Sequence, residues 1–312
     1  MRLNLDYISS AVPVDLILKE LTSERFVRHT NKGGNEIYIV NYHNSPNIMQ
    51  EIGRLRELTF ASAGGGTGNS VDIDFYDTSE NCYQQLIVWA PESKEIIGGY
   101  RFIDCANIVD TDPLQLSTCS YFHFSDTFIK EYLPYTVELG RSWVQPNFQP
   151  SRESRKGIFA LDNLWDGLGA IVVDNPHIKY YSGKVTLYAE YDRECRDALM
   201  YFMDYFFKDQ NKLITPIRSI SSSSDIRQFE HDIQGLAYKE AHKVLNSFVR
   251  ERGENIPPLI NNYMSLSPSM KTFGTTFNAD FGQVEETMIL VKIEDIYQEK
   301  KARYIDTYTP RG

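Results

Sequence analysis

VELGRSWVQPNFQPSRESRKGIFALDNLWDGLGAIVV, residues 137–173, combines an apolar stretch, a basic loop and a longer apolar stretch. The β-branched and aromatic residues of its first part predict a strand, and its last part predicts a buried helix. The loop between them ends at Gly157 and carries three cations: Arg152, Arg155 and Lys156. Backbone N–H groups and the helix dipole at such a helix start can hold a phosphate. A solvated surface loop is the alternative.

The predicted strand carries a carboxylate and a cation three residues apart, Glu138 and Arg141. Side chains three apart in a regular strand point to opposite faces of the sheet. A bulge at Gly140 would bring both to one face. An E-x-x-R spacing alone is typical of an ion pair, so a Glu138–Arg141 pair that only fixes the strand is the alternative.

The rest of the chain alternates strands and helices. Before the quoted stretch we expect a short helix at 13–21, a hairpin at 25–41, a helix from Pro46, and antiparallel strands at 82–90 and 95–104. After it we expect a strand at 178–188, helices at 193–207 and 235–251, and a strand at 286–293. This pattern predicts an α+β fold, a mixed, largely antiparallel sheet flanked by helices.

A serine-rich stretch near 215–232 marks a soft boundary. The sequence thus predicts an N-terminal helix and hairpin (1–44), a core (45–215) and a C-terminal extension (216–312). The extension is expected to pack on the core.

The 312 residues carry a formal net charge of −10, which argues against nucleic acid as a partner. The four cysteines form no C-x-x-C pair and the six histidines form no H-E-x-x-H arrangement, so no metal site is expected. No window holds 18 consecutive apolar residues, and charged residues interrupt the N-terminal stretch. These features predict a cytoplasmic protein, with peripheral membrane contact left open.

Further short motifs precede the strand. Arg56 and Phe60 share a predicted helix, and Asp74 and Asp77 follow a glycine-rich loop that the sequence predicts to be irregular and mobile. Arg101 ends the run IIGGYR. Each motif is weak alone, because a D-x-x-D spacing is common in turns and a strand-end arginine is usually solvated or structural. Their succession along the chain is the stronger signal.

In this order the motifs resemble those of the Gcn5-related N-acyltransferase superfamily, whose strand–basic loop–helix unit holds the phosphate of an acyl-pantetheine donor. The R-x-x-x-F, D-x-x-D and E-x-x-R spacings are similar to those of acyl-homoserine lactone synthases. VELGRSWVQPNFQ more closely resembles the bacterial N-acyltransferases that make ornithine and glycine lipids, often labelled hemolysin-like. The resemblance covers residues 50–293 and implies an acyl-CoA N-acyltransferase-like fold.

The resemblance implies transfer of a long-chain 3-hydroxy or plain fatty acyl group to the amine of a small amino acid, the first step of an aminolipid pathway. Acyl carrier protein is the expected donor partner, because a basic dock offsets the repulsion between two acidic proteins. Coenzyme A would use the same loop. Contact with the inner membrane would be peripheral.

Glycine is the favoured acceptor and ornithine the next, since AGGGTG at 63–68 resembles the glycine-lipid members most closely. Lactone synthases carry a tryptophan in the loop over their nucleotide-bearing substrate, whereas residues 61–70 hold no aromatic residue. A lactone synthase-like enzyme is therefore a distant alternative. A non-catalytic acyl-carrier binding module is the alternative from another class.

The resemblance also assigns roles. Glu138, next to Arg141, would take the proton of the amine, and backbone N–H groups of Trp143 and Val144 would polarise the thioester carbonyl. The donor phosphate and carrier would meet Arg152, Arg155, Lys156 and Gly157. The acceptor pocket would comprise Arg56, Phe60, Asp74, Asp77 and Arg101. The two arginines of this pocket either pair with the aspartates or bind the acceptor's carboxylate. No cofactor or metal is expected beyond the donor thioester.

Overall fold

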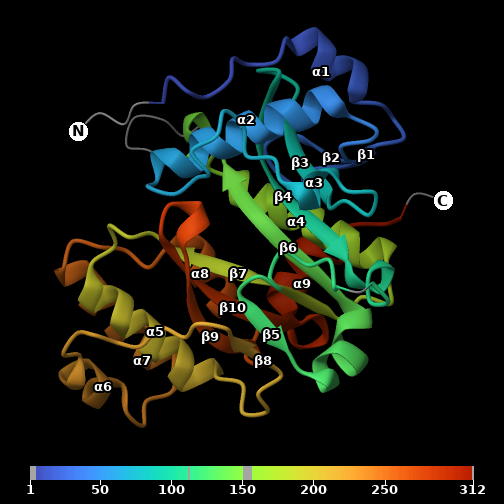
Figure 1. Cartoon of the computed structure of the whole chain (residues 1–312). Helices are drawn as coiled ribbons and strands as arrows, with labels where there is room; N and C mark the ends of the chain where they lie inside the picture. The colour runs from blue at the N-terminus through green and yellow to red at the C-terminus, as the bar shows by residue number, and fades with distance from the viewer. Residues whose placement is uncertain (1–4, 112, 150–156, 311–312) are drawn as a thin grey trace.

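The computed structural model describes residues 5–111, 113–149 and 157–310 (Figure 1). Its strands are β1 (Phe26–His29), β2 (Glu36–Val40), β3 (Gln84–Ala90), β4 (Glu95–Asp104), β5 (Phe122–Phe124), β6 (Thr136–Val144), β7 (Tyr180–Leu187), β8 (Ile214–Pro216), β9 (Lys271–Asn278) and β10 (Val284–Lys292). Its α-helices are α1 (Val14–Glu20), α2 (Pro46–Ser62), α3 (Phe75–Thr78), α4 (Ala160–Asp174), α5 (Arg193–Phe207), α6 (Arg227–Ile233), α7 (Tyr238–Glu251), α8 (Pro258–Met264) and α9 (Gln298–Tyr304).

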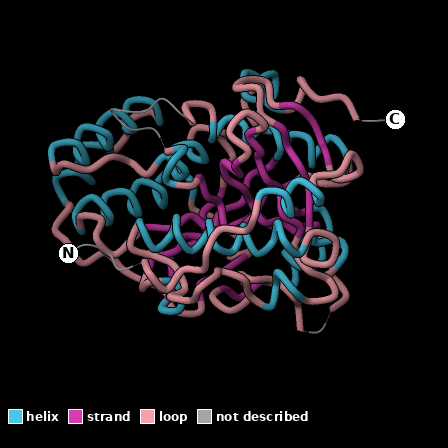
Figure 2. The backbone as a smooth tube through the Cα atoms, turned by 90° about the horizontal axis from the view of Figure 1, so that it is seen from above, coloured by secondary structure: helices cyan, strands magenta, loops and turns pink. Residues whose placement is uncertain are grey.

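One large mixed sheet organises the described residues, with eight strands in the order β1-β2-β3-β4-β6-β7-β10-β9. All neighbouring pairs are antiparallel except β6 and β7, which are parallel. Figure 2 shows these strands in the middle of the molecule with helices around them. The predicted α+β fold, a largely antiparallel sheet flanked by helices, is confirmed. The strands expected on either side of the quoted stretch are present.

Two apolar layers cover the two faces of the sheet. On one face, α1 and α2 pack on the strands through side chains such as Ile52 and Trp143. On the other face, α4, α5 and α7–α9 form a larger core that includes Leu164 and Ile289. Met288, the strand neighbour of Ile289, belongs to a third cluster around β5. Because neighbouring strand residues point to opposite faces, this third cluster extends the α2 layer.

The ends of the chain join the same sheet as its middle. The N-terminal hairpin supplies β1 and β2, and the segment after residue 216 supplies β9 and β10. The serine-rich stretch near 215–232 contains the end of β8 and most of α6. The division at 44/45 and 215/216 stays a prediction about the chain's organisation.

The parallel strands β6 and β7 pair over a short distance and then separate. Their pairing runs from Thr136 and Tyr180 to Leu139 and Gly183. Beyond these residues β6 follows β4 and β7 follows β10, so the sheet opens between them. Gly183 allows the closest approach, since a Cβ there would lie 2.4 Å from the Leu139 carbonyl oxygen.

A bulge lies at the start of this opening. One residue of β4, Tyr100, stands opposite two residues of β6, Arg141 and Ser142. Arg141 has a φ of 45°, a left-handed conformation that L-residues rarely adopt. The bulge turns the Arg141 side chain to the α2 side of the sheet, where Glu138 also lies. The predicted bulge is confirmed, one residue beyond Gly140.

Candidate active site

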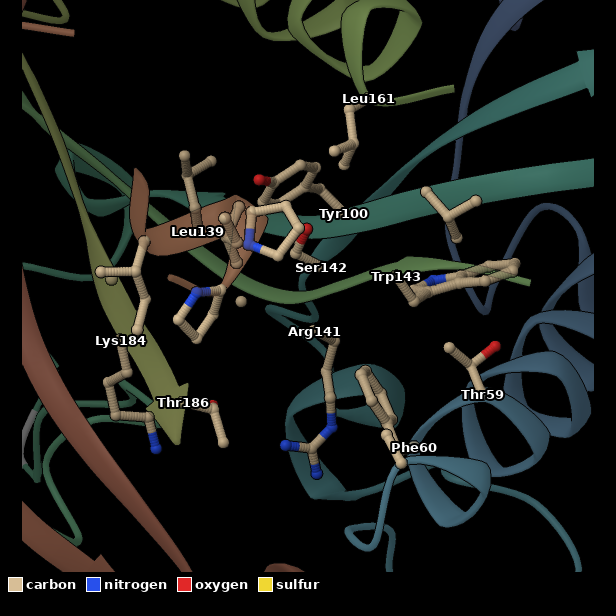
Figure 3. Close-up of a pocket in the computed structure, with 18 of the residues that line it drawn as sticks. Thr59, Phe60, Tyr100, Leu139, Arg141, Ser142, Trp143, Leu161, Lys184 and Thr186 are labelled. Carbon is tan, nitrogen blue, oxygen red and sulfur yellow. The ribbon is translucent and has the colours of Figure 1, made fainter. Parts of the chain in front are cut away.

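A cavity of about 500 Å³ occupies the opening between β6 and β7 and extends to both faces of the sheet (Figure 3). Towards α4 and α8 its wall is mostly apolar, with Tyr100, Leu161, Ile260, Tyr263 and Ile289. Towards α2 and the third cluster it carries polar groups, namely Thr118, Arg141, Lys184, Thr186 and Glu286. The cavity therefore joins an apolar compartment to a polar one across the sheet.

Glu138 lies directly behind the polar wall. It is 1% exposed, and its Oε1 accepts hydrogen bonds from the Tyr83 hydroxyl at 2.6 Å and the Ser117 hydroxyl at 2.9 Å. Its Oε2 accepts a short hydrogen bond of 2.5 Å from Thr118. Ser117 and Thr118 line the cavity, whereas Glu138 does not. A proton from the cavity would therefore reach Glu138 through one of these hydroxyl groups.

Arg141 pairs with an aspartate of the glycine-rich loop. Its Nε and Nη2 atoms lie 2.8 and 3.1 Å from the two carboxylate oxygens of Asp72, and its guanidinium stacks over Phe281 at 4.2 Å. Among the described residues no ion pair joins Glu138 to Arg141. The alternative of a Glu138–Arg141 pair is therefore not what holds this strand.

The four charged residues of the predicted acceptor pocket form a largely buried network. Arg56 donates to Asp77 at 3.0 Å, and Arg101 donates to Asp74 at 2.7 Å and to Asp77 at 3.4 Å. Gln85 adds a hydrogen bond of 2.9 Å to Asp77. Arg56 and Asp77 are fully buried. Leaving one partner of such a pair alone typically costs roughly 3–5 kcal/mol, which makes this network a rigid support for the site.

Charge partners set the protonation of this network. Burial acts to raise the pKa of Asp77, but Arg56 and Arg101 outweigh it and hold that pKa well below its usual range. Burial acts to lower the pKa of Arg101, but the charges of Asp77 and Asp74 outweigh this effect and hold the pKa above its usual value. Asp77 and Arg101 are therefore charged at neutral pH. The structure pairs both arginines with aspartates, and only Arg101 of the two lines the cavity.

Phe60 and the glycine-rich loop close the α2 side of the cavity. Phe60 lines it and meets Phe281 edge to face, with ring centroids 5.0 Å apart. The loop is tied to Glu57, a buried carboxylate that accepts hydrogen bonds from the Thr67 amide and hydroxyl and from the Gly68 amide at 2.8–2.9 Å. The sequence predicts a mobile loop, but it does not reveal Glu57 as the anchor.

The two backbone amides assigned to the thioester carbonyl differ in direction. The Gln145 amide donates to Ile97 of β4, and the Val144 carbonyl accepts from the Gln149 side chain on the other side. Since N–H groups alternate along an antiparallel strand, the Trp143 N–H points towards β4 and the Val144 N–H into the opening. Val144 is thus the amide of this pair that can meet a ligand.

The basic loop falls partly outside the described residues, because Arg152, Arg155 and Lys156 are among the residues that the structure does not describe. Gly157 is described and lines the cavity. It has a φ of 79°, and a Cβ there would lie 1.8 Å from the Phe148 carbonyl oxygen. Helix α4 begins three residues later without a side-chain cap. The Ala160 N–H at this helix start donates to the Gly157 carbonyl at 2.8 Å.

Sequence reasoning missed a second ion pair in the cavity wall. Lys184 of β7 and Glu286 of β10 lie 2.6 Å apart, with side chains 12% and 5% exposed. No motif marks these residues, which are 102 positions apart in the sequence. The sequence does carry one signal for them, the alternation of side chains along a strand. It places Lys184 and Glu286 on the same face of the sheet, the face that forms the polar wall of the cavity.

Two features are absent from the described residues. No group of three or more histidine, cysteine, aspartate or glutamate side chains in this part of the chain is placed to hold a metal ion. Within the same residues, no helix has the length and apolar character needed to cross a bilayer.

Comparisons with solved structures find a distant likeness. The acyl-homoserine lactone synthase BjaI, in complex with SAM and isopentyl-CoA, is 11% identical, with a TM-score of 0.37 and coverage of 88% of this chain and 89% of that one. The AHL synthase LasI is 12% identical, with a TM-score of 0.32 and coverage of 49% and 73%.

Comparisons with sequences find much nearer relatives. The acetyltransferase (GNAT) domain family matches residues 55–156. The glycine N(alpha)-acyltransferase of Phocaeicola vulgatus is 48% identical over 306 residues, which cover 97% of this chain and 94% of that protein. The glycine N(alpha)-acyltransferase of Bacteroides thetaiotaomicron is 49% identical over 307 residues, or 97% and 91%. The chain therefore belongs to the N-acyltransferase family of these two proteins and is an acyltransferase with a GNAT domain.

Proposed function

We propose that this protein transfers a long-chain fatty acyl group, plain or 3-hydroxylated, from acyl carrier protein to the amine of glycine. The observation that carries the proposal is the cavity, which joins an apolar and a polar compartment through the opening of the sheet. An acyl thioester and a zwitterionic amino acid have these opposite characters and must meet at one carbonyl carbon. The names of the two relatives support glycine as the acceptor.

The donor would enter beside Gly157, at the start of α4. The N–H groups of that helix start, together with Arg152, Arg155 and Lys156, would hold the pantetheine phosphate. A basic loop on a chain of net charge −10 also gives an acidic carrier protein a place to dock. The acyl chain would lie against the apolar wall formed by α8 and its neighbours, including Ile260 and Tyr263.

The acceptor would enter from the polar side, where the walls favour a small molecule. The glycine-rich loop is packed closely there, because a Cβ at Gly65 would lie 2.8 Å from the Tyr188 ring and a Cβ at Gly282 would lie 2.6 Å from the Gly65 backbone. Tyr188 and Phe281 line the same end of the cavity. A small amino acid fits such a closed end better than a nucleotide-bearing substrate.

In the reaction the acceptor's ammonium loses one proton, and the neutral amine attacks the thioester carbonyl. Glu138 would receive this proton through the Ser117 or Thr118 hydroxyl. The Val144 N–H would stabilise the oxyanion of the tetrahedral intermediate. When the C–S bond breaks, the thiolate takes up a proton and the nitrogen, now in an amide, releases its second one. The products are an N-acyl amino acid, the first intermediate of an aminolipid pathway, and a free carrier thiol.

Incubation of the protein with isotope-labelled acyl carrier protein and single amino acids tests this proposal. Mass spectrometry of the extracted lipids should find N-acylglycine as the main product, because the acceptor end of the cavity is small. If N-acylornithine were the main product, the acceptor would be ornithine and not glycine. An acyl lactone would favour the lactone synthase alternative. Carrier binding with no product from any amino acid would indicate a non-catalytic binding module.

Glu138→Gln tests the proton relay. We expect turnover to fall by about 10²-fold or more, since the amide cannot receive the proton, while the fold and carrier binding stay near wild type. Steady-state kinetics at neutral pH measures the loss. Asp104→Asn is the matched control, because Asp104 ends the neighbouring strand and pairs with His177 at the surface. A loss of less than about tenfold in Glu138→Gln would place the base elsewhere.

Arg155→Glu/Lys156→Glu tests the carrier dock. The dissociation constant for acyl carrier protein should rise by at least about tenfold, and added salt should weaken wild-type binding in the same direction. The glycine KM should not change, and stability should stay within about 1 kcal/mol. The double reversal Lys239→Glu/Lys243→Glu, on an exposed face of α7, controls for net charge. An unchanged carrier affinity in the first variant would show that the loop is only solvated surface.

A further inference from the structure

The Lys184–Glu286 pair differs from the structural ion pairs around it. Its neighbour in β10, Glu285, points to the other face and binds Arg196 with both carboxylate oxygens, each at 2.6 Å. Both interactions of Glu286 instead use Oε2, which accepts from Lys184 at 2.6 Å and from Asn278 at 3.0 Å. In the described residues, Oε1 of Glu286 has no hydrogen-bond donor. This carboxylate lines the cavity with one oxygen unused.

Lys184 also has hydrogen-bonding capacity to spare. An ammonium group can donate three hydrogen bonds, and among the described residues Glu286 is the acceptor found for this one. The Tyr121 ring also lies beside this ammonium, with its centroid 4.3 Å from Nζ. Figure 3 shows Lys184 and Arg141 at the same end of the cavity, away from Tyr100 and Leu161. Two nitrogens of Arg141 face the carboxylate of Asp72, whereas Lys184 meets a single carboxylate oxygen of Glu286.

A second layer holds the pair in place. Asn278, which donates to Glu286, accepts a hydrogen bond of 2.9 Å from the Tyr121 hydroxyl. Burial, followed by the charges of Glu286 and Asp280, raises the pKa of Tyr121 to about 12, so the hydroxyl stays a donor at neutral pH. A buried ion pair contributes little net stability compared with apolar side chains of similar size. The Lys184–Glu286 pair, held in place at a cavity wall, is therefore better suited to binding a ligand than to stabilising the fold.

We propose that Lys184 and Glu286 bind the acceptor amino acid as a zwitterion, with Lys184 holding its carboxylate and Glu286 its ammonium group. This inference rests on the proposed function and assigns its acceptor site. Opposite charges on one small molecule match the unused donors of Lys184 and the unused Oε1 of Glu286. The ammonium thereby lies at the polar wall that also carries Ser117 and Thr118, the route to Glu138. Bond making and breaking stay as written above, since this pair binds and orients.

Two single variants separate the roles, with glycine and glycinamide as the acceptors. Glu286→Gln should raise the glycine KM by about tenfold or more, because a hydrogen bond to a charged group becomes a neutral one, while the donor KM stays unchanged. Lys184→Gln should lower the preference for glycine over glycinamide, taken as the ratio of kcat/KM values, by about tenfold or more. Glycinamide lacks the carboxylate, so its own kcat/KM should change little in Lys184→Gln.

Controls keep the test independent of folding. Glu285→Gln changes the adjacent residue on the opposite face and should leave the glycine KM at the wild-type value. Lys184→Gln/Glu286→Gln removes both charges together, so no lone buried charge remains. It should fold and combine the two losses. Lys184→Arg should keep part of the preference for glycine over glycinamide that Lys184→Gln loses.

The outcomes distinguish this inference from the function on which it rests. A wild-type protein that acylates an amino acid, with folded Glu286→Gln and Lys184→Gln variants that keep the wild-type KM and preference, overturns the inference alone. A wild-type protein that acylates no amino acid refutes the proposed function and the inference with it. A raised glycine KM in Glu286→Gln with an unchanged KM in Glu285→Gln supports the inference.

Discussion

The site depends on the separation of two parallel strands. β6 and β7 pair from Thr136 and Tyr180 to Leu139 and Gly183, and each then follows its other neighbour. This geometry frees the Val144 N–H and makes a passage between the two apolar layers of the protein. The bulge at Arg141 and Ser142 then directs side chains of β6 towards the α2 side. The contacts proposed for Val144, Lys184 and Glu286 are made from the walls of this opening.

Electrostatics divide the charged residues around the opening into two groups. The network of Arg56, Asp77 and Arg101, with Asp74, satisfies its own charges and supports the walls. Lys184 and Glu286 keep unused hydrogen-bonding atoms on the cavity surface. Motif spacing alone does not separate these groups, because both contain buried opposite charges a few ångströms apart. Contact with the cavity separates them, because Lys184 and Glu286 line it whereas Arg56 and Asp77 do not. This difference argues that the Arg56–Asp77 pair supports the site while the other pair meets the ligand.

Much of the fold could be predicted from the sequence, because periodicity and turn residues act locally. Helix α2 begins at Pro46 and the bulge occurs beside Gly140 as expected. The pairing of Arg56 with Asp77 was one of two open alternatives, since spacing does not show whether a charge is already neutralised. Glu138 is predicted from the sequence to take the proton of the amine, but its position behind Ser117 and Thr118 is not, because no motif marks those two residues. Lys184 and Glu286 come together through strand order, a long-range property that local patterns do not carry.

The most direct test of this account is a crystal structure with a non-hydrolysable acyl-pantetheine phosphate bound. The acyl chain and pantetheine should pass through the opening between β6 and β7, with the phosphate beside Gly157 at the start of α4. The carbonyl oxygen that replaces the thioester oxygen should lie about 3 Å from the Val144 amide nitrogen. A ligand bound on the outer surface, with the cavity between the strands empty, would contradict the account.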